Sequence, residues 1–153
     1  MAANTRFATA VHVLVLLASN PDSLKTSSVM AEQLQTNAVV IRRILSLLQQ
    51  ADLITSQKGP AGGSRPTHSA KDISLADIYR AVDAGNALHI PVARGGGVVR
   101  INASLERVYA EGRDCFLEAL EGTTLAQLLK RSNLAVKNQA VKNRPAKNKS
   151  GKK

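Results

Sequence analysis

Between residues 26 and 68, two short helical patterns are followed by a glycine-rich hairpin pattern, and this order constrains the fold more than any other feature of the chain. Thr26 or Ser27 is expected to cap the first helix, which runs to about Leu34. Three of its apolar side chains are predicted to turn inward: Val29, Met30 and Leu34.

A second helix is predicted from Ala38 to about Ala51, after the tight link Gln35-Thr36 and with Asn37 as its N-cap. Its apolar face comprises Val40, Ile41, Ile44, Leu45, Leu47 and Leu48. Its outward face comprises Val39, Arg42, Arg43, Ser46, Gln49 and Gln50. Two short helices joined by a tight turn, the second with a basic and amide-rich outer face, are typical of a helix-turn-helix.

The hairpin pattern follows the second helix directly. Residues 53–57 are an expected strand, residues 58–63 a glycine-rich turn and residues 64–68 a returning strand. Because Pro66 cannot donate to a ladder, the returning strand must lie at an edge. A hairpin directly after a recognition helix is a wing, so the predicted fold class is mainly α with a small β-wing, a winged helix-turn-helix.

An apolar helix is predicted from Asn4 to Asn20, and it must be covered on more than one face because most of its sides are apolar. The apolar run of residues 7–18 is too short to span a bilayer. His12 interrupts it and no clean cleavage site follows, which argues against a signal peptide. We therefore expect a buried helix, no membrane partner and a cytoplasmic protein.

Three helices are predicted after the hairpin. Two capping-box patterns start short ones: Ser74 with Asp77, and Thr124 with Gln127. The first of these helices is expected to end at Gly85, and an irregular loop and a long helix over about residues 98–121 follow. The long helix carries a seam suited to packing against another long helix, at Ile101, Leu105, Val108, Gly112, Cys115 and Ala119.

These patterns divide the chain into three parts. Residues 1–85 form the winged helix-turn-helix domain, and residues 86–131 form a linker loop and the dimerisation helices. Residues 132–153 have the composition of a disordered basic tail.

The charge of the chain favours a polyanionic partner. It has 21 Lys and Arg residues against 11 Asp and Glu, a net charge of +10. Residues 132–153 hold seven basic residues and no acidic one, and residues 37–71 hold five basic residues against Asp52 alone. Nucleic acid fits this distribution better than an anionic membrane surface. Aromatic residues make up only 3%, which argues against a stacking platform for single strands.

The sequence offers no motif for catalysis or metal binding. The glycine run 59–63 lacks the Gly-Lys-Ser/Thr ending of a phosphate-binding P-loop. The single cysteine, Cys115, has no Cys or His at ligand spacing and is expected to be a buried apolar residue, with a redox role as the alternative. The three histidines have no partner acids nearby in sequence. We therefore expect a protein that is not an enzyme and needs no cofactor or metal.

Several residues of the helix-turn-helix and the hairpin suit contacts with duplex DNA. Arg42 is expected to meet base edges and Arg43 a phosphate, although both could be ordinary solvated charges. The hydroxyl residues 26–28 suit a phosphate at a helix start, with capping alone as the alternative. The hairpin glycines let the backbone approach DNA while Lys58 supplies charge, and a hairpin turn without a ligand is the alternative.

Four motifs resemble those of one family. They are Ala51-Asp52-Leu53-Ile54, Lys58-Gly59-Pro60-Ala61-Gly62-Gly63, Ile73-Ser74-Leu75-Ala76-Asp77-Ile78 and Thr124-Leu125-Ala126-Gln127-Leu128-Leu129. In the first, the family pattern is alanine-glycine-leucine-valine. Over about residues 4–131 the chain resembles the Rrf2 family of bacterial winged helix-turn-helix regulators, which includes the iron–sulfur cluster regulator, the nitric-oxide-sensing repressor and the cysteine-metabolism repressor.

The resemblance implies a homodimer held by the long C-terminal helix, with two recognition helices in successive major grooves of a near-palindromic operator. It places Val39, Arg42 and Arg43 in the major groove and Lys58 at the minor groove or flanking phosphates. The expected DNA-binding set is Thr26, Ser27, Ser28, Ala38, Val39, Arg42, Arg43, Lys58, Gly59, Gly62 and Arg65. The expected dimerisation residues are Ile101, Leu105, Val108 and Cys115.

Three departures from the family pattern matter. Where cluster-binding members place three cysteines, residues 86–97 contain none, so an iron–sulfur cluster is not expected. Ser64 stands where the family usually has an aromatic residue, which predicts a more loosely anchored wing. Lys58 replaces the commoner Arg, which keeps the charge but loses the planar fork.

The sequence thus predicts a cluster-free, dimeric, DNA-binding transcriptional regulator, with repression as the expected action and a basic tail that strengthens non-specific binding. Two alternatives stay open: a basic RNA- or ribosome-associated protein, and a dimeric interaction scaffold that has lost operator binding. The sequence does not identify the signal, which could be a small molecule near residues 86–97, a partner protein, or no effector at all.

Overall fold

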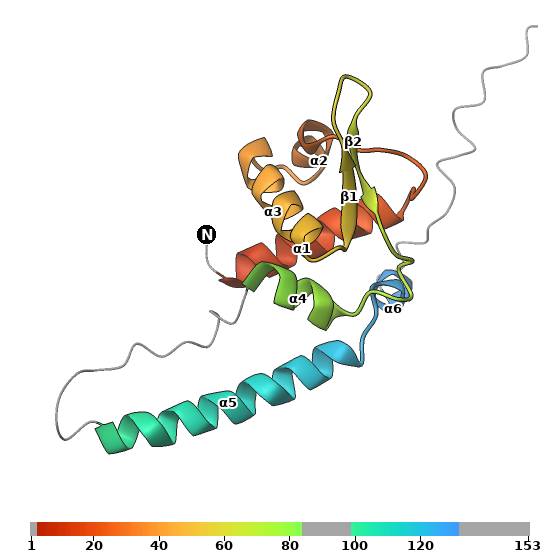
Figure 1. The fold of residues 1–153 in the computed structure, drawn as a ribbon. Coiled ribbons are helices and arrows are strands. Elements are labelled where there is room, and N and C mark those ends of the chain that lie inside the picture. Colours follow the sequence, from red (N-terminus) through yellow and green to blue (C-terminus); the bar gives the residue numbers. More distant parts are fainter. Residues whose placement is uncertain (1–2, 84–98, 132–153) are drawn as a thin grey trace, which may run out of the picture.

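The computed structural model describes residues 3–83 and 99–131, and there the chain is mainly helical with one two-stranded antiparallel hairpin (Figure 1). The elements are α1 (Ala3–Ala18), α2 (Ser27–Gln33), α3 (Ala38–Gln50), β1 (Ile54–Gln57), β2 (Gly63–Pro66), α4 (Leu75–Asp83), α5 (Val99–Glu121) and α6 (Leu125–Arg131). The predicted fold class is confirmed. The expected helix end at Gly85, the expected loop of residues 86–97 and the basic tail of residues 132–153 lie outside the described residues.

The helices α2 and α3 begin where the capping residues predict. The Thr26 hydroxyl accepts the Val29 N–H at 3.3 Å, and the Asn37 side chain accepts the Val39 N–H at 2.7 Å. Each cap satisfies a backbone donor that has no partner within the helix. The start of each helix in the helix-turn-helix is therefore set by a local hydrogen bond that can be predicted from the sequence.

Each of these helices is followed, two residues after its last residue, by a residue with positive φ that is not glycine. Gln35 has φ 49° and Asp52 has φ 58°. The N–H of the next residue reaches back into the last turn, from Thr36 to the Ala31 carbonyl in α2 and from Leu53 to the Leu48 carbonyl, at 3.0 Å, in α3. These bonds are those of a Schellman motif, whose left-handed position is usually glycine.

The two capping boxes lie side by side. In the first, the Asp77 side chain accepts the Ser74 N–H at 2.9 Å and the Ser74 hydroxyl accepts the Asp77 N–H at 3.0 Å. Thr124 and Gln127 exchange the same pair of bonds at the start of α6. Ser74 and Thr124 form an antiparallel bridge, so the starts of α4 and α6 are fixed to each other.

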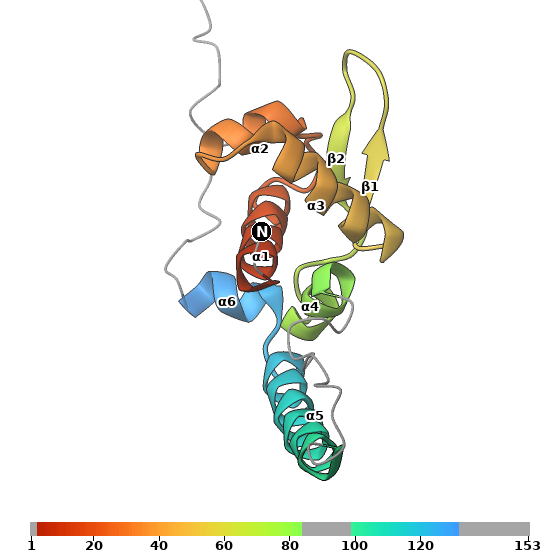
Figure 2. The same cartoon turned by 90° about the vertical axis from the view of Figure 1, so that its left-hand side faces the viewer.

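Helix α1 occupies the centre of the winged domain. Figure 2 shows α2, α3 and the hairpin on one side of it, with α4 and α6 on the other. The core is mainly aliphatic, and its largest fully buried side chains include Leu14, Leu17, Met30, Ile41, Ile44, Leu48, Ile54, Ile73, Ile78 and Leu125. The prediction that α1 is covered on more than one face is confirmed.

The predicted inward orientation of Val29 is wrong. Its side chain is 44% exposed, whereas the next two residues of α2, Met30 and Ala31, are buried. A helix of two turns has room for only a narrow buried stripe, and Met30 and Ala31 fill it.

The wing is tied to the segment that leads into α2. Its strands pair from Ile54 with Pro66 to Gln57 with Gly63. Lys25 and Ser64 exchange two backbone hydrogen bonds, with N···O distances of 3.1 and 2.9 Å. A Cβ on Gly63 would lie 2.9 Å from the Lys25 backbone, so only glycine permits this approach without a shift. The backbone, and not a side-chain ring at position 64, therefore holds the wing in place.

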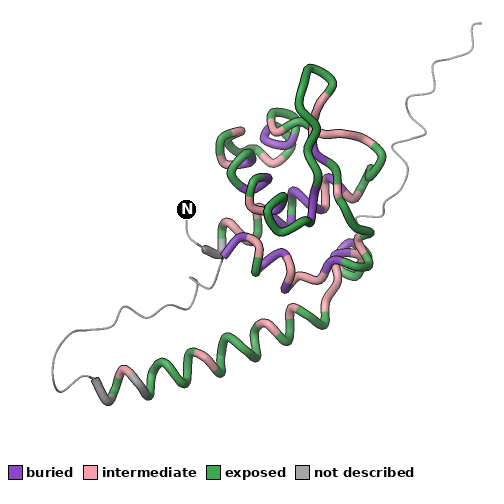
Figure 3. The backbone as a smooth tube through the Cα atoms, in the orientation of Figure 1, coloured by how far each residue is buried: buried purple, intermediate pink, exposed green. Residues whose placement is uncertain are grey.

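Helix α5 extends away from the winged domain (Figure 1), and most of its surface is exposed (Figure 3). Its exposed large apolar side chains are Ile101, Leu105, Val108, Tyr109 and Phe116. Cys115 is exposed as well, so its expected burial is not found within a single chain, where no described element covers this face. Within residues 3–83 and 99–131 we find no helix with the length and apolarity needed to cross a membrane.

Candidate nucleic-acid interface

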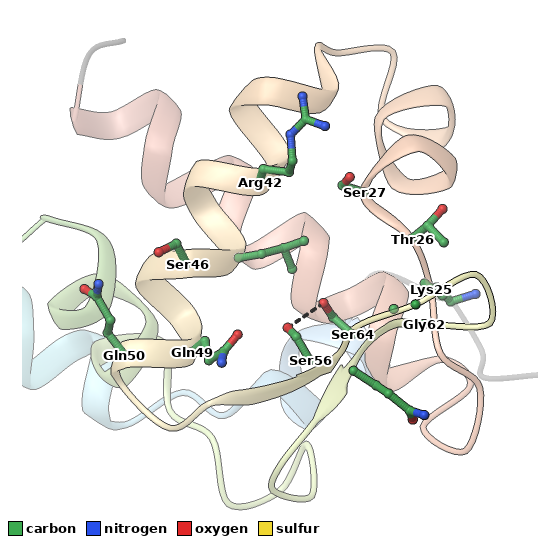
Figure 4. A pocket seen from close by; sticks show the side chains of 14 residues that line it. Lys25, Thr26, Ser27, Arg42, Ser46, Gln49, Gln50, Ser56, Gly62 and Ser64 are labelled. Atoms are coloured by element: carbon green, nitrogen blue, oxygen red, sulfur yellow. Dashed lines mark hydrogen bonds between the residues drawn. The ribbon is translucent and has the colours of Figure 1, made fainter.

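An open groove of about 760 Å³ lies between α3, the residues that lead into α2, and the wing (Figure 4). Its lining includes two cationic side chains, four serines and three glutamines, and no aspartate or glutamate. A groove with this lining offers hydrogen-bond donors and acceptors within a positive field. That combination suits the phosphates and base edges of a nucleic acid.

Helix α3 supplies one wall of the groove. Arg42, Ser46, Gln49 and Gln50 line it, and all four are exposed. Residues three or four positions apart share a helix face, and the buried face of α3 opposite them packs into the core. The predicted division of α3 into an apolar and an outward face is therefore confirmed.

The segment before α2 supplies the second wall. Lys25, Thr26 and the first residue of α2, Ser27, line the groove, and the backbone pairing of Lys25 with Ser64 fixes their position beside the wing. The Thr26 hydroxyl already accepts the Val29 N–H, so capping is one function of this residue.

The wing supplies the third wall. Gly59 has φ 113°, which favours glycine, and a Cβ on Gly62 would lie 2.2 Å from the Gln57 carbonyl oxygen. The geometry of the turn thus requires both glycines, whether or not DNA approaches. At the base of the wing, the Ser56 and Ser64 hydroxyl oxygens lie 2.9 Å apart in a hydrogen bond, and Ser64 is buried.

The groove gathers part of the predicted contact set. Thr26, Ser27, Arg42, Gly59 and Gly62 line it. The others lie outside its lining: Ser28, Val39, Arg43, Lys58 and Arg65 are exposed, and Ala38 is partly buried at the start of α3.

Seven polar residues of the groove were not in the predicted set: Lys25, Ser46, Gln49, Gln50, Ser56, Gln57 and Ser64. The spacing of Ser46, Gln49 and Gln50 from Arg42 on the outward face of α3 was a usable signal. The sequence contained no such signal for Lys25, because its position depends on the pairing with Ser64, which is distant in sequence.

A comparison with protein families matches residues 3–131 to Rrf2, described as "Iron-dependent Transcriptional regulator". The chain belongs to the Rrf2 family. The match covers every described residue, from α1 through the winged domain to α6. The family is one of transcriptional regulators and not of enzymes.

The chain is also similar to individual proteins and solved structures. The chain is 32% identical over 127 residues to YwnA of Bacillus subtilis (strain 168), named "Putative HTH-type transcriptional regulator", which covers 83% of this chain and 93% of YwnA. A solved structure titled "Crystal structure of a putative DNA binding protein" is 29% identical with a TM-score of 0.68, over 81% of this chain and 98% of that one. T. potens IscR is 21% identical with a TM-score of 0.64, over 88% and 90% of the two chains, and supports the fold alone.

The donor set of this Rrf2 chain does not fit an iron–sulfur cluster. Such clusters are held by cysteine thiolates, with histidine in a few cases. The sequence contains one cysteine, and Cys115 lies on the exposed surface of α5. In the part of the chain that the structure describes, no three His, Cys, Asp or Glu side chains are grouped to hold a metal ion.

Proposed function

We propose that this Rrf2 protein is a repressor that binds a near-palindromic operator as a homodimer, in the cytoplasm and without an iron–sulfur cluster. The observation that carries the proposal is the groove between α3 and the wing, whose polar lining includes Lys25 and Arg42 and no acidic residue. The outward face of α3 continues this surface with Val39 and Arg43. Together they form a basic surface of the kind that contacts phosphates and base edges.

The exposed apolar face of α5 supports the homodimer. Ile101 and Val108 are 59% and 62% exposed, and Leu105 is 39% exposed. Three large aliphatic side chains at heptad-like spacing on one helix are costly to leave in water, and a second α5 would bury them. A two-fold dimer carries two copies of α3, which explains why a near-palindromic site is expected.

Repression needs only occupation of the operator, which these two surfaces would provide. The single cysteine supports regulation without a cluster, since even a dimer would offer only two thiolates. The domain division at residues 85 and 131 belongs to the same proposal. It separates the DNA-binding part from the α5 dimer contact and from the basic tail.

The test is to incubate the full chain with fragmented genomic DNA of its own organism at near-physiological salt and to sequence the retained fragments. We expect a two-fold-symmetric motif, which Arg42→Ala should abolish. Lys71→Ala is the matched control, because Lys71 is an exposed cation outside the groove and beside the Ala70 carbonyl that binds α6. Retention of featureless DNA, or preference for structured RNA, would contradict the proposal.

A further inference from the structure

Val39 is an exposed valine on the outward face of α3. Its side chain is 60% exposed. Among the described residues outside α5, the only other large apolar side chain exposed to a comparable extent is Val29 of α2, at 44%. The α5 dimer contact cannot account for Val39, because α3, whose first turn contains Val39, lies with α2 and the wing on the side of the domain away from α5 (Figure 2).

The position of Val39 is fixed by the start of the helix. Its N–H donates to the Asn37 side chain at 2.7 Å, which places Val39 in the first turn of α3. A β-branched side chain in a helix has one strongly preferred χ1 rotamer, so little side-chain entropy is lost on contact. Arg42 follows three residues later on the same face.

The chemistry of valine restricts what it can recognise in DNA. It has no hydrogen-bonding side-chain group, and the apolar feature of the major groove is the C5-methyl group of thymine. The first turn of a recognition helix is the part that reaches base edges in helix-turn-helix proteins. An arginine on the same face is suited to a guanine edge.

We infer that Val39 is a specificity-determining residue that contacts the methyl group of a thymine in each operator half-site. Helix rise separates Val39 and Arg42 by about 4.5 Å, between one and two base steps of about 3.4 Å. The thymine therefore lies within two base pairs of the guanine that Arg42 contacts. This inference rests on the proposed operator binding and names the base that the operator must contain.

The experiment begins with selection of sites from a random duplex library by the full-length protein. Each thymine of the selected site is then replaced by deoxyuridine, which removes only the methyl group, and affinity is measured by fluorescence anisotropy. We expect one thymine per half-site, close to a guanine, whose replacement weakens binding of the unaltered protein about fourfold. With Val39→Ala, the same replacement should have no further effect.

Two variants serve as controls. Val29→Ala removes the other exposed valine of the helix-turn-helix, and the thymine effect should persist in it. Val39→Thr keeps one methyl group, and the thymine preference should persist there too. Val39→Ala itself is expected to fold, because the side chain is exposed and alanine has the higher helix propensity.

The outcomes separate this inference from the proposed function. Selection could yield a symmetric motif in which no thymine shows a methyl effect that depends on Val39. That outcome would overturn the inference and leave the repressor proposal standing. A methyl effect of equal size in Val39→Ala would do the same. If selection enriches no motif, both the Val39 inference and the proposed operator binding are contradicted.

Discussion

The Tyr79 ring of α4 packs edge-on against the Phe116 ring of α5, with the ring centroids 5.2 Å apart. On the other side, Tyr79 meets Phe7 of α1 at 5.5 Å in the same kind of contact. The sequence has two Phe, two Tyr and no Trp, so three of its aromatic residues meet here. An otherwise aliphatic protein concentrates its aromatic contacts where α5 joins the winged domain.

We predict that Phe116→Ala loosens α5 from α4. An edge-to-face pair contributes about 0.5–1.5 kcal/mol beyond its buried area, and Phe116 is 42% exposed, so a loss of about 1 kcal/mol is expected. Hydrogen exchange should rise along the C-terminal half of α5 and stay unchanged in α3. Glu118→Ala, an exposed change on the same helix, is the control. Equal protection of α5 in both variants would contradict this role of the ring pair.

The stability of the protein should depend on pH in the alkaline range through Tyr79. Burial, together with a hydrogen bond to Asp83 and the negative charge of Asp83, raises the pKa of Tyr79 from 10.0 to about 12. The folded chain therefore holds the phenol proton more tightly than the unfolded chain. Its contribution to stability is complete below pH 10 and is lost as the pH rises from 10 to about 12.

Two variants isolate this effect. Urea unfolding of Tyr79→Phe should show a flatter loss of stability across that window than the unaltered protein. Tyr109→Phe keeps Tyr79 as the one remaining tyrosine, so an ultraviolet titration of this variant should report the raised pKa directly. A tyrosine titration near its ordinary value in Tyr109→Phe would refute the prediction.

The left-handed residues that follow α2 and α3 offer stabilising substitutions. Gln35 and Asp52 carry Cβ atoms at φ 49° and 58°, where glycine avoids a steric cost. We expect Gln35→Gly and Asp52→Gly each to raise the free energy of unfolding by about 0.5–1 kcal/mol. The larger gain is expected at Gln35, because Asp tolerates this conformation better than Gln does.

The control for this prediction lies two residues away. Gln33 is the last residue of α2, and Gln33→Gly should lower the free energy of unfolding by up to about 1 kcal/mol. Urea denaturation at one protein concentration compares the variants. If Gln33→Gly and Gln35→Gly change the free energy of unfolding in the same direction, backbone conformation is not the deciding factor.

The sequence predicted what local chemistry determines. The caps at Thr26 and Asn37 and the capping boxes at Ser74 and Thr124 set the helix starts, because each is completed within three residues. The amphipathic pattern of α3 placed Arg42 on the outward face for the same reason.

Features that depend on distant contacts escaped prediction. Val29 turned outward because α2 has only a narrow buried stripe, which its own sequence does not reveal. Lys25 lines the groove because its backbone pairs with Ser64, which is distant in sequence. Gln35 and Asp52 adopt left-handed conformations without the usual glycine, so the sequence did not reveal them. The family motif has glycine where this chain has Asp52, which was a usable signal for that position.

Lys25 should bind DNA without reading its sequence. It lines the groove beside the wing, opposite the outward face of α3 that we propose reads the bases. We predict that Lys25→Ala weakens binding to all duplexes alike and lowers the slope of log affinity against log salt by about one per subunit. Lys71→Ala, a cation outside the groove, should leave the slope unchanged. A change of preferred sequence in Lys25→Ala would assign Lys25 to base contacts instead.

The basic tail should act in the same electrostatic way and more strongly. Residues 132–153 carry seven Lys and Arg residues and no acidic one. Because each neutralised phosphate adds about 0.9 to the salt slope, a chain ending at Arg131 should bind more weakly at low salt and show a shallower slope. Its selected site should be the same as that of the full chain, since the outward face of α3 is intact. Loss of sequence preference in the shortened chain would show that the tail takes part in recognition and not only in attraction.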